Sequence, residues 1–229
     1  IDFIEKIADK TGLPVGIKSA IGQLDFWDEL AQRMKTRNAG PDFITIDGGE
    51  GGTGAAPMPL IDLVGMSVRE AVPLVCNLRD EYGFKERIRL ISSGKLVNPG
   101  DVAWALAAGA DFVTSARGFM FALGCIQALQ CNQNTCPTGI TTHNTKLQRG
   151  LDPTDKAERV YHYKENMEHA VAIIAHSCGV TEPRHLRRYH CRMVQSNGRS
   201  VPLDQLYPEH RTQDGRPTNN RRTAENQPS

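Results

Sequence analysis

The chain has 229 residues, of which 39% are hydrophobic, and its 27 lysines and arginines nearly balance its 26 aspartates and glutamates. This composition is typical of a folded globular protein and excludes disordered, collagen-like and disulfide-scaffold chains. A net charge of +1 gives no electrostatic reason to expect nucleic acid or an anionic membrane as a partner. No apolar run approaches the roughly 18 residues of a membrane span, and the first residues do not resemble a signal peptide. We therefore expect a cytoplasmic protein.

The first residues already follow a helical pattern. The chain opens on Ile1 rather than Met, and Phe3, Ile4, Ile7 and Ala8 fall at helical spacing. We therefore expect this chain to be a fragment or a processed piece of a longer protein.

Four short apolar runs rich in β-branched residues predict β-strands, over Pro14–Ile21, Phe43–Asp47, Ile88–Ser92 and Asp111–Ser115. A helical pattern fills each gap, over residues 25–35, 67–83 and 102–108. The second of these helices begins with Ser67 and Glu70 at the spacing of a capping box. Strands alternating with helices are typical of a parallel sheet buried on both faces. The predicted fold class is α/β.

The pattern changes after the fourth strand. We predict a helix over residues 119–129, then a cysteine-rich stretch, a long helix from about 153 to 177 and a shorter one over 182–189. From Ser196 onward the chain has few apolar residues, which cannot offset the entropy of ordering, and this predicts a disordered tail. The predicted units are therefore residues 1–118, a cysteine-rich segment 119–145, a helical segment 146–195 and the tail 196–229.

The second predicted strand runs directly into the sequence GGEGGTGAAP, with glycines at 48, 49, 51, 52 and 54. Glycines at this density suit backbone that takes positive φ or lets a flat ligand approach closely. The loop is not a dinucleotide fingerprint, because Pro57 prevents a helix directly after it, and no Gly-Lys-Ser/Thr makes it a P-loop. A flexible surface loop is the alternative. Glu50 and Thr53 favour a ligand-binding loop, since a linker has little need of a charged side chain there.

The third and fourth predicted strands end in Ser92-Ser93-Gly94-Lys95 and Ser115-Ala116-Arg117-Gly118. Each loop combines small residues with one cation. In (β/α)8 barrels the loops after strands 7 and 8 often bind phosphate at a helix N-terminus, so these loops suit the second half of such a barrel. Ordinary βα turns are the alternative. Lys18 lies inside the first strand, where it either extends to solvent or points into the active site.

Three of the six cysteines, Cys125, Cys131 and Cys136, form the pattern C-x5-C-x4-C followed by proline. Clustered cysteines without a signal peptide bind metal or iron-sulfur more often than they form disulfides. Three thiolates suffice for a 3Fe-4S cluster, whereas zinc requires His143 as a fourth ligand. Unliganded cysteines are the third alternative. Two other features have structural interpretations. His162, His169 and His176 recur every seven residues, which predicts that they lie on one face of a helix. Cys76 lies on the apolar stripe of its predicted helix, which predicts a position in the core.

The segments IKSAIG, IDGGEGGTGAAP, LISSGKL and GCIQALQCNQNTCPTG occur in this order. With them, residues 1 to about 190 resemble the flavin-binding synthase domain of the glutamate synthase family, and most closely its short stand-alone members. The resemblance implies a (β/α)8 barrel with FMN at its C-terminal mouth and a 3Fe-4S cluster beside the flavin. The chain is then the C-terminal half of that barrel, a TIM barrel, with four βα units, the iron-sulfur cysteine segment and C-terminal helices.

The resemblance also implies a reaction, that of a glutamate synthase-like oxidoreductase acting on CH-NH2 donors. Ammonia and 2-oxoglutarate give 2-iminoglutarate, reduced FMN transfers a hydride to it, and glutamate leaves. Electrons arrive through the cluster from an electron-donor protein or subunit. Because this chain has no glutaminase domain, ammonia comes from a source on another chain.

The resemblance assigns roles to residues by position. Lys18 and Glu50 are the implied catalytic residues, and the implied FMN-binding residues are Lys18, Gly49, Glu50, Gly51, Gly52, Thr53, Ser93, Gly94, Lys95, Ala116 and Arg117. The implied cluster ligands are Cys125, Cys131 and Cys136. The large enzymes of the family carry His-Asp at positions 49 and 50 and Asp-Gly-Gly at 93 to 95, which leaves the exact substrate open.

Three alternatives follow from these departures and from the length of the chain. The first is a related FMN enzyme that uses another amine donor, as an N-methylglutamate synthase-like subunit does. The second is a non-catalytic subunit that keeps the cluster for electron transfer. The third is a segment with no activity of its own, because part of the flavin site is contributed by other residues.

Overall fold

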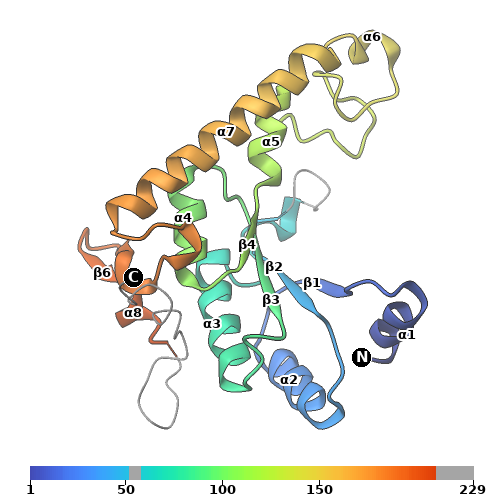
Figure 1. The fold of residues 1–229 in the computed structure, drawn as a ribbon. Helices are drawn as coiled ribbons and strands as arrows, with labels where there is room; N and C mark the ends of the chain where they lie inside the picture. The colour runs from blue at the N-terminus through green and yellow to red at the C-terminus, as the bar shows by residue number, and fades with distance from the viewer. Residues whose placement is uncertain (52–57, 210–229) are drawn as a thin grey trace, which may run out of the picture.

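The computed structural model describes residues 1–51 and 58–209. Its centre is a four-stranded parallel sheet in the order β1 (Gly16–Ala20), β2 (Phe43–Asp47), β3 (Arg89–Ser93) and β4 (Phe112–Thr114). The four strands lie side by side in chain order, as Figure 1 shows. β2 has its predicted bounds, β1 and β4 lie within their predicted runs, and β3 is shifted by one residue. The predicted α/β class is therefore confirmed.

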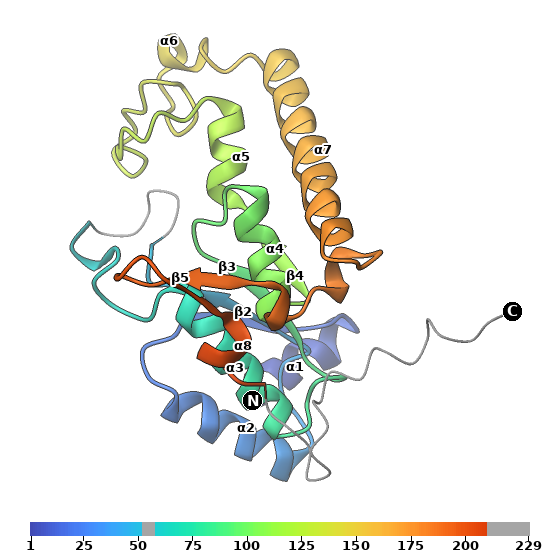
Figure 2. The same cartoon turned by 90° about the vertical axis from the view of Figure 1, so that its left-hand side faces the viewer.

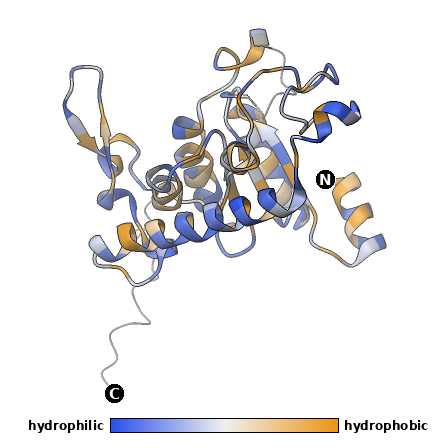
Figure 3. Ribbon diagram, turned by 90° about the horizontal axis from the view of Figure 1, so that it is seen from above, coloured by the Kyte–Doolittle hydropathy of each residue, from blue (hydrophilic) through white to orange (hydrophobic). Residues whose placement is uncertain are grey.

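Helices cover one face of this sheet. α2 (Asp25–Arg37), α3 (Val68–Glu81) and α4 (Pro99–Ala108) pack against one another in chain order and against β2, β3 and β4. The main hydrophobic core lies between these helices and the sheet, where Ile46 and Leu90 are fully buried. α1 (Asp2–Thr11) is different, because none of its residues is buried and its hydrophobic residues, orange in Figure 3, include a largely exposed Phe3.

The opposite face of the sheet is only partly covered. Along β2, Ile44 and Ile46 are buried whereas their neighbours are half-buried, and Phe112 on β4 is 50% exposed. The prediction of a sheet buried on both faces is thus wrong for the described residues. In a (β/α)8 barrel this second face points into the barrel, where side chains of all the strands cover it.

The C-terminal part of the chain packs on the outside of this layer. α7 (Pro153–Ser177), with its predicted bounds, lies along both α5 (Ala116–Leu123) and α4, as Figures 1 and 2 show. A short helix, α6 (Thr145–Gln148), precedes it, and a 3-10 turn, η1 (Met58–Leu60), lies between β2 and α3. None of the helices in the described ranges is long and apolar enough to cross a bilayer.

Two predicted helices differ from the structure. The helix predicted over 119–129 is α5, which starts at Ala116 and ends at Leu123 because Gly124 takes a left-handed conformation with φ 101°. The helix predicted over 182–189 is replaced by two 3-10 turns, η2 (Pro183–His185) and η3 (Arg188–His190). The buried Leu186 between them has an extended backbone with ψ 146°, which interrupts the helix.

The predicted disordered tail is wrong for residues 200–206. β5 (Arg192–Val194) pairs antiparallel with β6 (Ser200–Pro202), and α8 (Leu203–Leu206) follows directly. Leu203 is fully buried in the main core, and the buried Arg188 donates a 2.7 Å hydrogen bond to the carbonyl of Tyr207. A segment with few apolar residues is thus ordered by docking onto a core that other segments build. Residues 210–229 lie outside the described range.

Candidate active site

The carboxyl ends of the four strands carry polar side chains on one face. Asp47, Ser93 and Thr114 occupy the same register position on β2, β3 and β4, and Lys18 lies two residues before the end of β1. Side chains two residues apart on a strand point to the same face. This face is the one that α2, α3 and α4 do not cover. Active sites of (β/α)8 barrels lie at this end of the strands.

An open pocket lies at this end of the sheet. Its cavity volume is about 100 Å³, and it opens to solvent. It is lined by Lys18, Asp47, Gly51, Ser93, Gly94, Lys95, Thr114, Ala116 and Arg117. Most of the cofactor-binding residues predicted from the sequence are therefore in its lining. Gly49 and Glu50 are not in the lining, and Gly52 and Thr53 lie outside the described residues.

The pocket favours anions. Its lining contains Lys18, Lys95 and Arg117 against a single carboxylate, that of Asp47. Lys18 Nζ donates to Asp47 Oδ2 at 2.5 Å. Lys95 Nζ lies 2.9 Å from both carboxylate oxygens of Asp62, outside the lining. Among the described lining residues, cationic side chains outnumber carboxylates, which favours a negatively charged ligand.

The N-terminus of α5 adds hydrogen-bond donors to the pocket. α5 begins three residues earlier than predicted, so that Ala116 and Arg117 belong to its first turn. Ser115 precedes the helix, but within the described structure its side chain does not cap it; its hydroxyl donates to the carbonyl of Leu96 at 2.6 Å. The first N–H groups of a helix have no partner inside the helix and, with the helix dipole, favour an anion.

Gly94 requires the absence of a side chain. Its φ is +149°, and a Cβ atom there would lie 2.8 Å from Glu50 Oε2 and 3.0 Å from the Cβ of Val68. A larger residue would be strained and would push these neighbours away. The backbone of the loop after β3 therefore packs closely beneath the pocket and is available to a ligand above it.

Glu50 has a structural position rather than one in the pocket. Its Oε1 accepts a 2.7 Å hydrogen bond from the backbone N–H of Val68, the first residue of α3. The predicted capping box of Ser67 and Glu70 is wrong in this respect, because the Ser67 side chain makes no capping bond in the described structure. Glu50 Oε2 is buried and has no hydrogen-bond partner among the described residues. The predicted catalytic role of Glu50 stays a prediction.

Three polar residues near the site were missed by sequence reasoning: Asp47, Asp62 and Thr114. Asp47 did carry a signal, because it is a charged residue that ends an apolar strand directly before the glycine-rich loop. Asp62 carried none, since it follows that loop in a segment with no predicted element. Its backbone N–H donates to the carbonyl of Gly49 at 2.8 Å, and this contact places it next to Lys95.

The three clustered cysteines are not gathered into a metal site. Cys125 and Cys131 are half-buried and Cys136 is buried. Residues 1–51 and 58–209 contain no group of three or more His, Cys, Asp or Glu side chains that could hold a metal ion. The described geometry therefore fits neither a 3Fe-4S cluster nor zinc with His143. Burial raises the pKa of the Cys136 thiol, but hydrogen bonds with Thr138 and Thr141 outweigh this effect and lower it to about 6.

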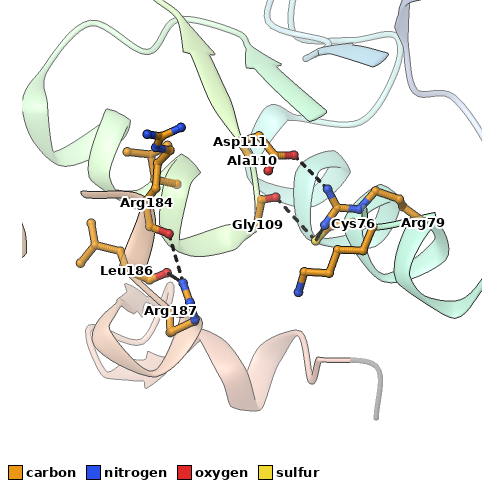
Figure 4. A pocket seen from close by; sticks show the side chains of 10 residues that line it. Cys76, Arg79, Gly109, Ala110, Asp111, Arg184, Leu186 and Arg187 are labelled. Atoms are coloured by element: carbon orange, nitrogen blue, oxygen red, sulfur yellow. Dashed lines mark hydrogen bonds and ion pairs between the residues drawn. The ribbon is translucent and has the colours of Figure 1, made fainter. Parts of the chain in front are cut away.

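A second pocket lies at the opposite end of the sheet. Figure 4 shows Cys76, Arg79, Asp111 and Arg187 in its lining, and Asp111 directly precedes β4. Arg79 Nη1 lies 3.0 Å from Asp111 Oδ2, and its Nε lies 2.8 Å from Asp80 Oδ1. Arg79 thus pairs with two carboxylates, and Lys85, 3.8 Å from Asp80 Oδ2, belongs to the same network. The amino-terminal face of a βα barrel contributes to stability. We therefore assign this pocket a structural role.

These features define part of a (β/α)8-barrel protein with a pocket rich in cationic side chains at the carboxyl ends of its strands. Solved structures with this fold include a flavocytochrome b2 mutant, with a TM-score of 0.52 and 16% sequence identity, which the alignment covers over 43% of its chain and 90% of this one. A flavocytochrome b2 double mutant with pyruvate bound gives a TM-score of 0.50 and 15% identity, over 81% of this chain and 36% of its own. At these identities the likeness concerns the fold alone.

The sequence comparisons identify the family. Residues 4–181 match the conserved region in glutamate synthase, and the chain belongs to the glutamate synthase family. The glutamate synthase large subunit-like protein YerD of Bacillus subtilis is 42% identical over 206 residues, which are 90% of this chain and 39% of YerD. The archaeal glutamate synthase (NADPH) of Methanocaldococcus jannaschii is 35% identical over 146 residues, 64% of this chain and 29% of that protein. The chain thus spans well under half the length of these relatives.

Proposed function

We propose that this chain supplies part of the FMN site of a glutamate synthase-like oxidoreductase. The observation that carries the proposal is the positively charged pocket at the carboxyl ends of β1 to β4, where the open N-terminus of α5 lies. Bound FMN, once reduced by the electron donor, would supply a hydride to the 2-iminoglutarate formed from 2-oxoglutarate and ammonia, which would give glutamate. The family relationship supports this reaction.

The phosphate of FMN has a suitable set of partners in the pocket. Ser93, Gly94 and Lys95 come from the loop after β3, and Ala116 and Arg117 from the first turn of α5. Backbone N–H groups at a helix N-terminus and nearby cations are the usual partners of a bound phosphate. The close packing of Gly94 leaves the space above the loop to the ligand.

Lys18 is the residue that we assign to the reacting end of the site. It comes from β1, and Asp47 on the next strand holds its ammonium group. A fixed cation stabilises negative charge that develops on a bound flavin, and it also binds the carboxylates of 2-oxoglutarate and glutamate. The side chain of Lys18 is 59% exposed, so that it is accessible to a ligand.

We also propose an electron-donor protein or subunit and an ammonia source on other chains as partners. Because the described cysteines are not gathered, we assign no electron route through an iron-sulfur cluster.

The test uses the chain in its natural full-length form. We expect about one FMN per chain and glutamate formation from 2-oxoglutarate, ammonia and a chemical reductant such as dithionite. Formation of N-methylglutamate from methylamine instead would identify the related amine-donor reaction. Protein that neither retains nor binds FMN would overturn the proposal.

A further inference from the structure

We infer that Tyr163 and Ser115 form a positioning pair that sets the phosphate end of the pocket and makes it select the phosphorylated flavin over riboflavin. The inference rests on the proposed function and concerns residues outside the pocket lining. Ser115 precedes α5, whereas Tyr163 comes from the middle of α7, which lies alongside α5.

The two hydroxyl groups connect three segments. Tyr163 Oη lies 2.9 Å from Ser115 Oγ and 2.7 Å from the carbonyl oxygen of Val97, and its single proton is shared between these two acceptors. Ser115 Oγ donates to the carbonyl of Leu96 at 2.6 Å. Leu96 and Val97 directly follow Lys95, the cation of the first phosphate-binding loop. These bonds therefore tie the loop after β3 to the first turn of α5, which is the second proposed phosphate-binding segment.

The pair also keeps the first turn of α5 open. Serine at this position usually accepts a hydrogen bond from the N–H two or three residues later. Here its hydroxyl is engaged by Leu96 and Tyr163 instead, and no side-chain cap forms in the described structure. The N–H groups of the first turn of α5 therefore receive no side-chain cap in the described structure and remain available to an anion.

The local sequence leaves room for this arrangement. A Cβ atom on Gly118 would lie 1.8 Å from Tyr163 Oη, so any larger residue there would displace the tyrosine. The ring of Phe119 meets the Tyr163 ring edge to face at 5.0 Å between centroids. The glycine therefore permits the approach of Tyr163, and the aromatic contact fixes the ring that carries the hydroxyl.

The position of the pair predicts which part of a ligand it affects. Both hydroxyls act on the loops that carry Lys95 and Arg117, while Lys18 and Asp47 lie on β1 and β2. Loss of the pair therefore weakens binding of the phosphate without weakening binding of the flavin ring.

The experiment measures Kd for FMN and for riboflavin, which lacks the phosphate, with the apoprotein of the natural full-length form. Tyr163→Phe should reduce the preference for FMN about fivefold, the usual effect of losing one hydrogen bond, and leave the riboflavin Kd unchanged. Ser115→Ala should act in the same direction. Both variants break the same connection between Tyr163 and Ser115. The double variant should therefore lose little more of the preference for FMN than the more severe single variant does.

Tyr161→Phe is the matched control, since Tyr161 lies on the same helix and is 58% exposed. It should leave both Kd values unchanged. An unchanged FMN preference in both Tyr163→Phe and Ser115→Ala, or an equal loss of FMN and riboflavin affinity, would overturn the inference but not the proposed function. A parent protein that binds no FMN would overturn both.

Discussion

Lys18 on β1 and Asp47 on β2 form an ion pair of 2.5 Å across adjacent parallel strands, at the end of the sheet where the pocket opens. Their side chains are 59% and 27% exposed, so the pair is accessible to a ligand. The lysine therefore neither extends freely into solvent nor is buried. The neighbouring carboxylate holds its charge at the pocket.

This pair leads to the first prediction. Lys18→Ala should lower kcat for glutamate formation about a hundredfold, because a fixed charge that stabilises the developing negative charge is lost. It should also shift the reduction potential of the bound flavin to more negative values. Lys18→Arg, which keeps the positive charge, should leave the reduction potential close to that of the parent protein. Lys10→Ala, at an exposed position on α1, is the control. Unchanged turnover in Lys18→Ala would exclude this role.

The second prediction concerns the N-terminus of α3. Glu50→Ala should lower the free energy of unfolding by about 1 kcal/mol, the usual cost of losing a helix cap, because Val68 loses its acceptor. Ser67→Ala should cost less than about 0.5 kcal/mol, since its side chain makes no capping bond in the described residues. Urea denaturation of both variants measures the difference. A larger loss of stability in Ser67→Ala than in Glu50→Ala would support the capping box expected from the sequence.

The third prediction concerns the buried guanidinium of Arg79. Arg79→Ala should lower the free energy of unfolding by about 3–5 kcal/mol, because it removes the nearest cation of Asp80 and of Asp111 in a buried region and leaves contacts of 3.8 Å with Lys85 and Arg89 among the described ion pairs. Arg33→Ala breaks an exposed pair with Glu29 on α2 and should cost less than about 1 kcal/mol. Thermal unfolding of the two variants provides the measurement. Equal losses would show that burial does not set the cost.

The fourth prediction tests the order of the C-terminal segment. Leu203→Ala should lower the free energy of unfolding by about 2–5 kcal/mol, as expected for a fully buried leucine. Val194→Ala removes a side chain that is 74% exposed and should have little effect. Hydrogen exchange of residues 200–206 adds a second measurement. Fast exchange there together with a neutral Leu203→Ala would support the disordered tail.

The fifth prediction comes from the sequence pattern of Cys125, Cys131 and Cys136. This pattern predicts a 3Fe-4S cluster, which contains three iron atoms and four sulfides per chain. The cluster should be lost in Cys131→Ser but not in Cys178→Ser. Because the described residues do not gather these thiols, cluster binding also requires a rearrangement of this segment. Iron and sulfide analysis of the natural full-length protein measures the content. Iron-free protein, prepared without air, would exclude the cluster.

The sequence was most informative where structure is local. β2 was predicted with its full bounds because a β-branched run is followed at once by glycines, and α7 because Pro153 and the end of its helical pattern mark both termini. The loops after β3 and β4 were predicted to lie together because their position at the carboxyl ends of adjacent strands determines where they lie, and residues of both line the pocket. These features depend on a few neighbouring residues.

Contacts between distant segments could not be predicted in this way. The cap of α3 comes from Glu50, 18 residues before Val68, and Lys95 meets Asp62 from 33 residues away. Leu203 is buried only because α3 and the sheet form the core that it joins. No periodicity or composition of a single segment specifies such partners.

Arg188 has a consequence for the order of folding. Its guanidinium donates to the carbonyls of Pro73, Ala108 and Tyr207, which are 115, 80 and 19 residues away in the chain. The first two bonds close long loops, whose entropic cost is met only after α3 and α4 are in place. We therefore expect the C-terminal segment to dock last during folding. During unfolding it should detach first, while the parallel sheet is still intact.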